Sequence, residues 1–176
     1  MKSTIASVSM MALALSSFAT ADVSCTGGKL QASFKPGLSN NGPEVHSVSI
    51  QGVATSCTST DPEVQVSAVN ISIDGHGAGG CDPVLSIHNG EASGELRIEV
   101  GDDSPATRVR GTFEISIPDG IQFTATAGDG PYTGSSIILE SALDVDLDDL
   151  TQSCLTGEIT DISAVVKSLN ILEDED

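Results

Sequence analysis

The chain has 176 residues and a formal charge of −18 at pH 7, because 25 Asp and Glu residues outnumber 7 Lys and Arg. This charge repels the phosphates of nucleic acids and anionic membrane surfaces, so we exclude both as partners. Only 3% of the residues are aromatic and Trp is absent, which argues against sugar-binding sites built on stacked aromatic rings.

The N-terminus has the layout of a secretory signal peptide. Lys2 precedes an apolar run, and the segment ends in Ala19-x-Ala21. The apolar run is shorter than the roughly 20 residues that span a bilayer. We therefore predict a signal peptide over residues 1–21, removed in a secreted, extracellular protein without a membrane span.

The mature chain is predicted to be a single domain over residues 22–172 with an acidic tail over residues 173–176. Loss of Lys2 leaves 6 basic and 25 acidic residues, a formal charge of −19. The field of such a chain favours a cationic partner or divalent ions, although solubility alone also explains it. We expect the partner to be an extracellular protein or a cell-wall component.

Four cysteines remain in the mature chain: Cys25, Cys57, Cys81 and Cys154. In an exported protein an even number of cysteines indicates disulfides, and four allow three connectivities. We favour Cys25–Cys57 with Cys81–Cys154, since this arrangement needs no interlaced loops, but the sequence does not choose. No C-x-x-C pair supports a zinc site.

The first half of the chain contains several runs in which apolar residues alternate with polar ones, as in strands with one buried face. The run from Glu63 to Asp74 changes phase midway, which predicts a bulge or a change of sheet near Ala68. The glycine-rich residues 75–80 are interpreted as a flexible connection anchored by Cys81. Asn89-Gly90 is interpreted as a turn between two strands.

The segment from Arg108 to Ala127 predicts the central β-hairpin. Two alternating runs flank Pro118-Asp119-Gly120, whose residues favour a turn. Further on, Leu143, Val145 and Leu147 alternate with aspartates and predict another strand. The last run, up to Leu172, is mixed, and residues 164–169 fit either a strand or a helical turn.

Together these segments predict an all-β fold: a β-sandwich, jelly-roll-like, of about nine or ten strands with two disulfides. A flattened barrel is an alternative. We find no convincing amphipathic helix.

The acidic cluster Asp144, Asp146, Asp148 and Asp149 is the best candidate for a cofactor, which would be calcium. Calcium prefers carboxylate oxygens, and D-x-D-x-D begins an EF-hand loop. Here Asp149 stands where that loop needs Gly, and Leu155 where it needs Glu. The solvent-facing side of a strand explains the aspartates more simply.

Other candidate sites are weaker. His46, His76 and His88 could surround a metal with Asp74 or Asp82, but no metal-ligand spacing such as H-x-x-H is present. Asn70-Ile71-Ser72 is a glycosylation sequon, and its apolar neighbours indicate that Asn70 points away from the core. No catalytic residue is assigned, because no nucleophile motif is present.

The residues Cys25-Thr26-Gly27, Phe34-Lys35-Pro36-Gly37-Leu38, Gly52 and Cys57 resemble a group of small exported proteins of actinomycetes and filamentous fungi. These proteins combine C-T-G, an aromatic-x-Pro-Gly-Leu strand end and a second cysteine about thirty residues on. The resemblance covers residues 25–60 and implies an exported, disulfide-bearing β domain. It implies no catalytic residue, and the acidity of this chain departs from the group.

Three functions are compatible with these patterns. The first is non-enzymatic surface binding by the loops at residues 75–80, 101–105 and 128–134, since loops commonly carry function. The second is a secreted hydrolase with a carboxylate pair or a metal site, which would need a concave pocket holding acids or His. The third is a calcium-stabilised, adhesin-like domain.

Overall fold

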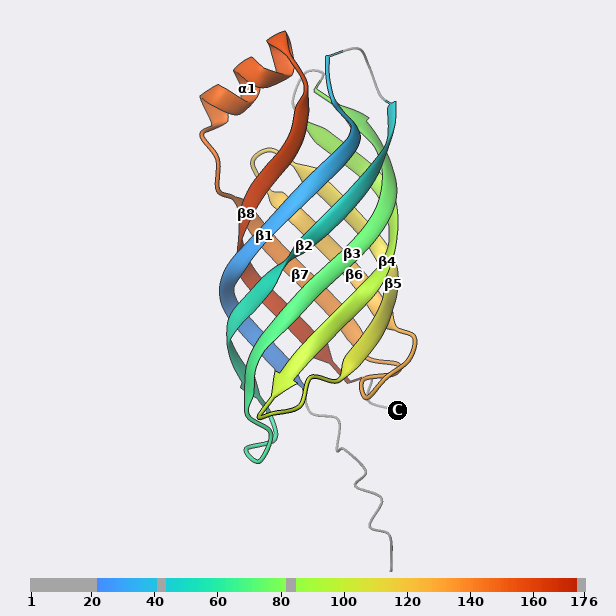
Figure 1. The fold of residues 1–176 in the computed structure, drawn as a ribbon, viewed down its shortest axis with the longest axis vertical. Coiled ribbons are helices and arrows are strands. Elements are labelled where there is room, and N and C mark those ends of the chain that lie inside the picture. Colours follow the sequence, from blue (N-terminus) through green and yellow to red (C-terminus); the bar gives the residue numbers. More distant parts are fainter. Residues whose placement is uncertain (1–21, 41–43, 82–84, 174–176) are drawn as a thin grey trace, which may run out of the picture.

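The computed structural model describes residues 22–40, 44–81 and 85–173, which form an eight-stranded antiparallel β-barrel with one helix (Figure 1). The predicted signal peptide and residues 174–176 of the predicted tail lie outside the described residues. The elements are β1 (Val23–Leu38), β2 (Glu44–Ser59), β3 (Val66–Gly80), β4 (Ser86–Val100), β5 (Ala106–Ser116), β6 (Gly120–Ala127), β7 (Ser136–Leu143), α1 (Leu147–Thr156) and β8 (Ile159–Leu172).

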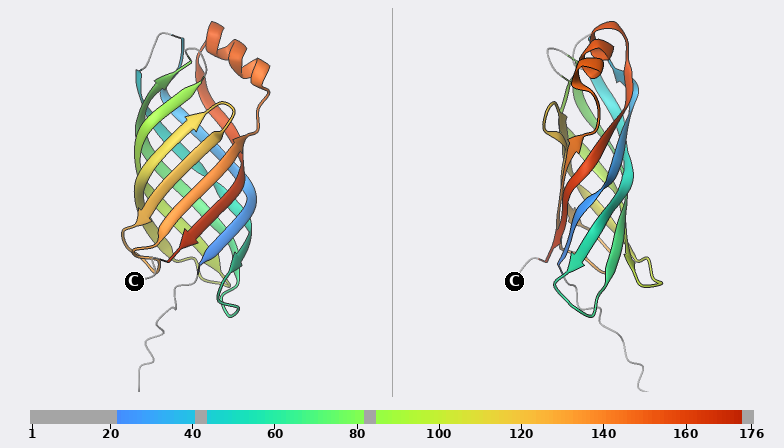
Figure 2. Two further views of the ribbon diagram at one scale, coloured as in Figure 1. Left: turned by 180° about the vertical axis from the view of Figure 1, so that it is seen from behind. Right: turned by 90° about the vertical axis from the view of Figure 1, so that its left-hand side faces the viewer.

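The predicted β-sandwich is wrong, because the strands close into a single ring. Each strand pairs with the next along the chain, and β1 also pairs with β8, for example Cys25 with Leu169 and Leu30 with Ala164. This last pairing joins the two ends of the domain, so no local pattern in the sequence reveals it. The flattened barrel that the sequence allowed as an alternative is the observed form, and Figure 2 shows it as narrow from the side.

The strands separate an apolar interior from a polar exterior. Inward residues of all eight strands form one core cluster, and its largest fully buried side chains include Phe113, Phe123 and Ile50. An eight-stranded barrel is just wide enough for side chains to fill its interior. The alternation seen in the sequence therefore corresponds to the inner and outer faces of one barrel wall.

Two predicted local features are confirmed. The central hairpin is β5–β6, in which Phe113 lies opposite Phe123 and the turn covers residues 117–119. The predicted irregularity near Ala68 is also present, because the register of β3 against β4 shifts between Val66 and Ala68. In both cases residues close in sequence determine the geometry, and alternation is a reliable guide.

Two predicted breaks are wrong, and the strands are accordingly fewer and longer. Asn89-Gly90 does not end a strand: it lies within β4, where the register shifts between Ile87 and Gly90 and Asn89 has a positive φ. Residues 75–80 are not a loop but the last part of β3, with Gly75, Gly77 and Gly79 facing inward. These glycines recur at every second position, which is typical of a strand. The high glycine content of the segment instead suggested a loop.

Some of these glycines belong to a row of small inward residues that crosses four neighbouring strands, Gly75, Ala92, Gly111 and Ala125. A Cβ built on Gly75 would lie 2.4 Å from the Glu91 carbonyl oxygen, and one on Gly111 would lie 2.0 Å from that of Thr124. Neighbouring backbones thus occupy the space of a side chain. Glycine at such points lets strands bend and a barrel close.

The helix α1 contradicts the expectation that no helix is present and that residues 143–147 form a strand. β7 ends at Leu143, and Asp146 begins the helix as its N-cap. The helix buries Leu150 and Cys154, which are four residues apart and share a face. The alternating pattern of residues 143–148 covers the end of a strand, a helix cap and the first helical turn. It therefore does not correspond to one strand, although alternation predicts one.

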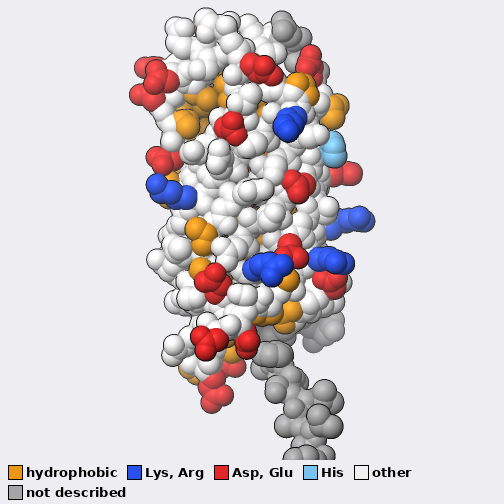
Figure 3. All heavy atoms as spheres, in the orientation of Figure 1, with side chains coloured by type: hydrophobic (Ala, Val, Ile, Leu, Met, Phe, Trp, Pro, Cys, Tyr) orange, Lys and Arg blue, Asp and Glu red, His pale blue; other side chains and the backbone are white. Residues whose placement is uncertain are grey.

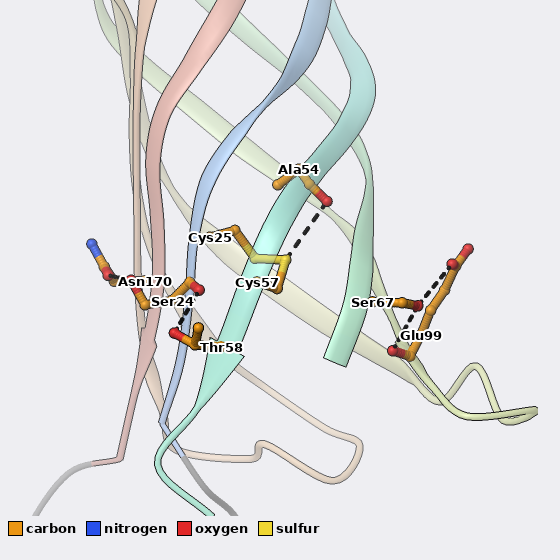
Figure 4. Close-up of a disulfide and its surroundings, with 8 residues drawn as sticks. All are labelled: Ser24, Cys25, Ala54, Cys57, Thr58, Ser67, Glu99 and Asn170. Carbon is orange, nitrogen blue, oxygen red and sulfur yellow. Dashed lines mark hydrogen bonds between the residues drawn. A yellow bond between two sulfur atoms is a disulfide. The ribbon is translucent and has the colours of Figure 1, made fainter. Parts of the chain in front are cut away.

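The two disulfides are those favoured from the sequence, Cys25–Cys57 and Cys81–Cys154. Cys25 and Cys57 are directly opposite on β1 and β2 (Figure 4). The second disulfide joins Cys81, which follows β3, to α1. Because α1 buries only two residues, this bond is its main attachment to the barrel.

Replacement of Gly111 by Ala should lower the free energy of unfolding by about 1–3 kcal/mol, because the new methyl group would overlap the backbone of β6. Gly128→Ala is the matched control, since a Cβ there meets nothing closer than the Arg108 carbonyl oxygen at 3.9 Å. Urea denaturation measures both. Equal midpoints for the two variants would contradict the role given to Gly111.

Candidate outer groove on strands β1 to β5

The candidate site is a groove on the outer wall, made of three adjoining hollows of about 600, 870 and 690 Å³. Asp74 of β3 lines all three. We call this surface the outer groove; its outward-facing lining residues are Ser33, Lys35, Ser47, Ser49, Ser72, Asp74, His76, Glu91, Ser93, Glu95, Arg108, Arg110, Thr112, Asp129, Glu158, Thr160 and Asp161. Figure 3 shows acidic and basic side chains spread singly over one face of the barrel, with uncharged atoms between them.

Strand register brings these residues together in rows. One row runs Ser49, Asp74, Ser93, Arg110 across β2 to β5, and the next runs Ser47, His76, Glu91, Thr112. Neighbouring positions in a row are about 4.5–5.5 Å apart at Cβ. The short hydroxyl side chains leave space between the longer charged ones, which makes the wall concave.

The floor of the central hollow is the row of small inward residues. Gly75, Ala92 and Gly111 line this hollow together with the outward residues. Because they carry at most a methyl group, the wall approaches the barrel axis here. The same residues that allow the barrel to bend therefore shape its outer surface.

Most charges at the two ends of the outer groove have partners within the chain. Arg97 contacts Glu95 at 2.7 Å, and Arg108 contacts Asp129 at 3.5 Å. In the centre the situation differs: within the described ranges, the side chains of Asp74, Glu91 and Arg110 make no ion pair or hydrogen bond. Two carboxylates and one guanidinium thus share an open hollow with free hydrogen-bonding capacity.

At the β8 end of the groove, hydrogen bonds stabilise the charged form of Asp161. The Ser33 hydroxyl donates to the Asp161 carboxylate at 2.6 Å, Thr160 donates at 2.9 Å and Gln31 at 3.4 Å. The bond from Ser33 is the largest cause that lowers the pKa of Asp161, and Thr160 follows. Asp161 remains ionised throughout neutral pH.

The acidic cluster proposed for calcium has a structural role in α1. Oδ1 of Asp146 accepts hydrogen bonds from the backbone N–H groups of Asp148 and Asp149, at 2.9 and 3.3 Å. Asp148 and Asp149 lie in the first helical turn, where negative charge is favourable. Asp144 precedes the cap. Asp146, Asp148 and Asp149 thus stabilise the start of the helix, whereas the alternating pattern predicted that they lie on a strand.

The histidines are not brought together. His46 is buried at 1% exposure, with its ring nitrogens 2.7 Å from the Pro36 carbonyl oxygen and 3.3 Å from that of Gly79. His76 and His88 face solvent on β3 and β4. Asp82 lies outside the described residues, and among those described no group of three or more His, Cys, Asp or Glu could hold a metal ion.

Asn70 faces away from the core, as predicted, and its amide nitrogen donates to Glu99 at 2.7 Å. The predicted binding loops 101–105 and 128–134 follow β4 and β6 at one end of the barrel. Tyr132 of the second loop is buried, and this burial, followed by the charge of Glu173, raises its pKa. That loop covers the barrel end as well as connecting strands.

Comparison with protein-family models, with curated proteins and with solved structures finds no match to this chain. The resemblance to small exported proteins therefore stays a prediction. No helix among the described residues has the length and apolar character to cross a membrane. Sequence reasoning weighed Asp74 only as a ligand beside the histidines and missed Glu91 and Arg110, because only strand register relates them.

The capping role of Asp146 gives a prediction that separates it from calcium binding. Asp146→Ala should destabilise α1 by about 1 kcal/mol, whereas Asp146→Asn should keep most of the stability because Asn is an equally good N-cap. Hydrogen exchange of the α1 amides measures this, with calcium and with chelator. A calcium-dependent rise in melting temperature that Asp146→Asn abolishes would instead support the calcium site.

Removal of the Ser33 hydroxyl should raise the pKa of Asp161, since the largest stabilising bond to the carboxylate is lost. A lowered pKa in the folded state contributes stability above the unfolded pKa of about 3.9, and this contribution disappears as pH falls through the folded value. NMR titration of the carboxyl carbon measures the shift. Thr160→Ala is the control and should give a smaller rise; a larger one would contradict the assignment.

Proposed function

We propose that this protein is an exported, disulfide-stabilised and non-enzymatic binding protein, and that its outer groove receives the ligand. The observation that carries the proposal is the set of charged side chains in the central hollow, Asp74, Glu91 and Arg110, which lack partners among the described residues. Groups of a ligand can form ion pairs or hydrogen bonds with these side chains without breaking a bond within the barrel.

Other surfaces support this role less well. The interior holds the apolar core cluster, and ligand exchange there would disturb the residues that hold the barrel together. Every described strand of the closed barrel has a neighbour on each side, so an extended ligand meets no continuous free edge to join by backbone hydrogen bonds. Apart from the loops at the barrel ends, side chains on the outer wall are therefore the remaining means of recognition.

A titration followed by NMR tests this proposal. The isotope-labelled mature chain is titrated with soluble probes of different chemistry: hexalysine, hexaglutamate, cellohexaose and the hexamer of glucosamine. We expect at least one probe to shift the amide signals of groove residues such as Asp74, Ser93 and Arg110. Shifts confined to residues 101–105, 128–134 or α1, or no shifts at all, would contradict a binding groove on the outer wall.

A hydrolase with a carboxylate pair is the second candidate, and one observation favours it. Asp74 and Glu91 lie on a diagonal of the β3–β4 ladder, where the backbone positions of two residues are about 7–8 Å apart, and both carboxylates line the same hollow. The two carboxyl groups of inverting glycosidases are separated by about 6.5–9.5 Å. Release of reducing ends from cellohexaose or the glucosamine hexamer, lost in Glu91→Gln, would favour the hydrolase over the binding protein.

A further inference from the structure

Two carboxylates and one guanidinium of the central hollow indicate the chemistry of the ligand. We propose, on the basis of the proposed function, that the outer groove binds an extended peptide segment of a partner protein and holds a Lys or Arg side chain of that segment between Asp74 and Glu91. Arg110 then contacts a carbonyl or carboxylate of the same segment.

Charge supports a cationic group on the ligand at two levels. Over the whole chain the formal charge is −18, which attracts basic partners over long range. Within the central hollow Asp74 and Glu91 contribute two negative charges and Arg110 one positive charge. Because the carboxylates occupy diagonal positions on β3 and β4, one ammonium or guanidinium group between them can donate hydrogen bonds to both.

The rest of the central hollow suits a peptide backbone. Ser47, Ser93 and Thr112 line the hollow between the charged residues, and each hydroxyl can donate and accept hydrogen bonds. Amide groups need both kinds of partner, whereas a purely anionic polymer needs donors only. The hydroxyl groups that line the central hollow therefore complement the alternating N–H and C=O groups of a peptide.

The length of the groove sets the length of the segment. Between β1 and β5 alone, the hollows cross four strand spacings, or about 19 Å. At about 3.3 Å per residue an extended peptide of about six residues covers this distance.

A peptide fits better than a polysaccharide because the groove offers no exposed aromatic ring for a sugar to stack on. The one aromatic residue that lines the hollows, Phe34, is 2% exposed and belongs to the core. An amine-bearing sugar polymer shares the positive charge, so the experiment includes it as a separate probe.

Fluorescence anisotropy of labelled hexalysine tests the proposal, with hexaglutamate and the glucosamine hexamer as comparison ligands. The double variant Asp74→Asn with Glu91→Gln should bind hexalysine about tenfold more weakly than the unchanged protein. The double variant Asp102→Asn with Asp103→Asn is the matched control: it also removes two negative charges, but in the exposed loop after β4, and should change the affinity less than about twofold. Circular dichroism melts confirm that each variant is folded.

The possible results separate the two proposals. Equal weakening in the groove double variant and in the control double variant at Asp102 and Asp103 would mean attraction by diffuse charge and would overturn the basic-peptide proposal. Groove-dependent binding of the glucosamine hexamer or of hexaglutamate, without hexalysine, would overturn it as well but leave the proposed function in place. If no probe binds and none shifts the groove signals, the proposed function fails with it.

Discussion

Closure of the sheet by the β1–β8 pairing is the constraint on which the rest of the structure depends. Residues near the two ends of the domain, such as Cys25 and Leu169, must meet in register before β1 and β8 each gain a second neighbour. Once they do, every strand has a hydrogen-bonded neighbour on both sides over most of its length. The stability of the barrel is thus cooperative, since loss of one seam would open the core along its whole length.

Closure also requires the wall to bend, and the small inward residues permit this. At Gly75 and Gly111 the neighbouring backbone lies where a side chain would otherwise be. Larger residues such as Phe113, which packs against Gly90, fill the interior elsewhere. The core therefore combines large residues, which bury apolar surface, with small residues, which allow the wall to curve.

The two disulfides stabilise parts of the fold that are held by other contacts to different degrees. Cys25 and Cys57 already face each other across a hydrogen-bonded ladder, so their bond reinforces an existing pairing. The bond from Cys81 to Cys154 holds a helix that otherwise buries only Leu150 against the barrel. Their chain separations of 32 and 73 residues indicate a comparable restriction of the unfolded chain, because the entropy of loop closure grows slowly with length.

The sequence predicted what depends on neighbouring residues. Alternation located the central hairpin, a phase change located the irregularity near Ala68, and an even number of cysteines indicated two disulfides. It did not predict closure, because the partner of β1 lies at the other end of the chain. It also failed where one residue type serves two purposes, as with the glycines at the end of β3 and the aspartates that begin α1.

The outer groove could not be predicted for the same reason as closure. Asp74, Ser93 and Arg110 lie on three different strands and carry no motif, and only the register of β3 to β5 aligns them. When each strand is considered alone, the polar residues of its alternating pattern indicate only a solvent-exposed face. Strand pairing turns three such faces into one surface, on which the few long charged side chains stand apart from many short hydroxyls.

Fold and proposed site are therefore linked through the two faces of the same wall. Along β3, Gly75 faces inward and lets the strand approach its neighbours, while Asp74 and His76 on either side face outward into the hollow. A bulky residue at Gly75 would act on the core, whereas an exchange at Asp74 alters only the outer surface. The barrel can thus retain its core while the charged residues of the proposed site change.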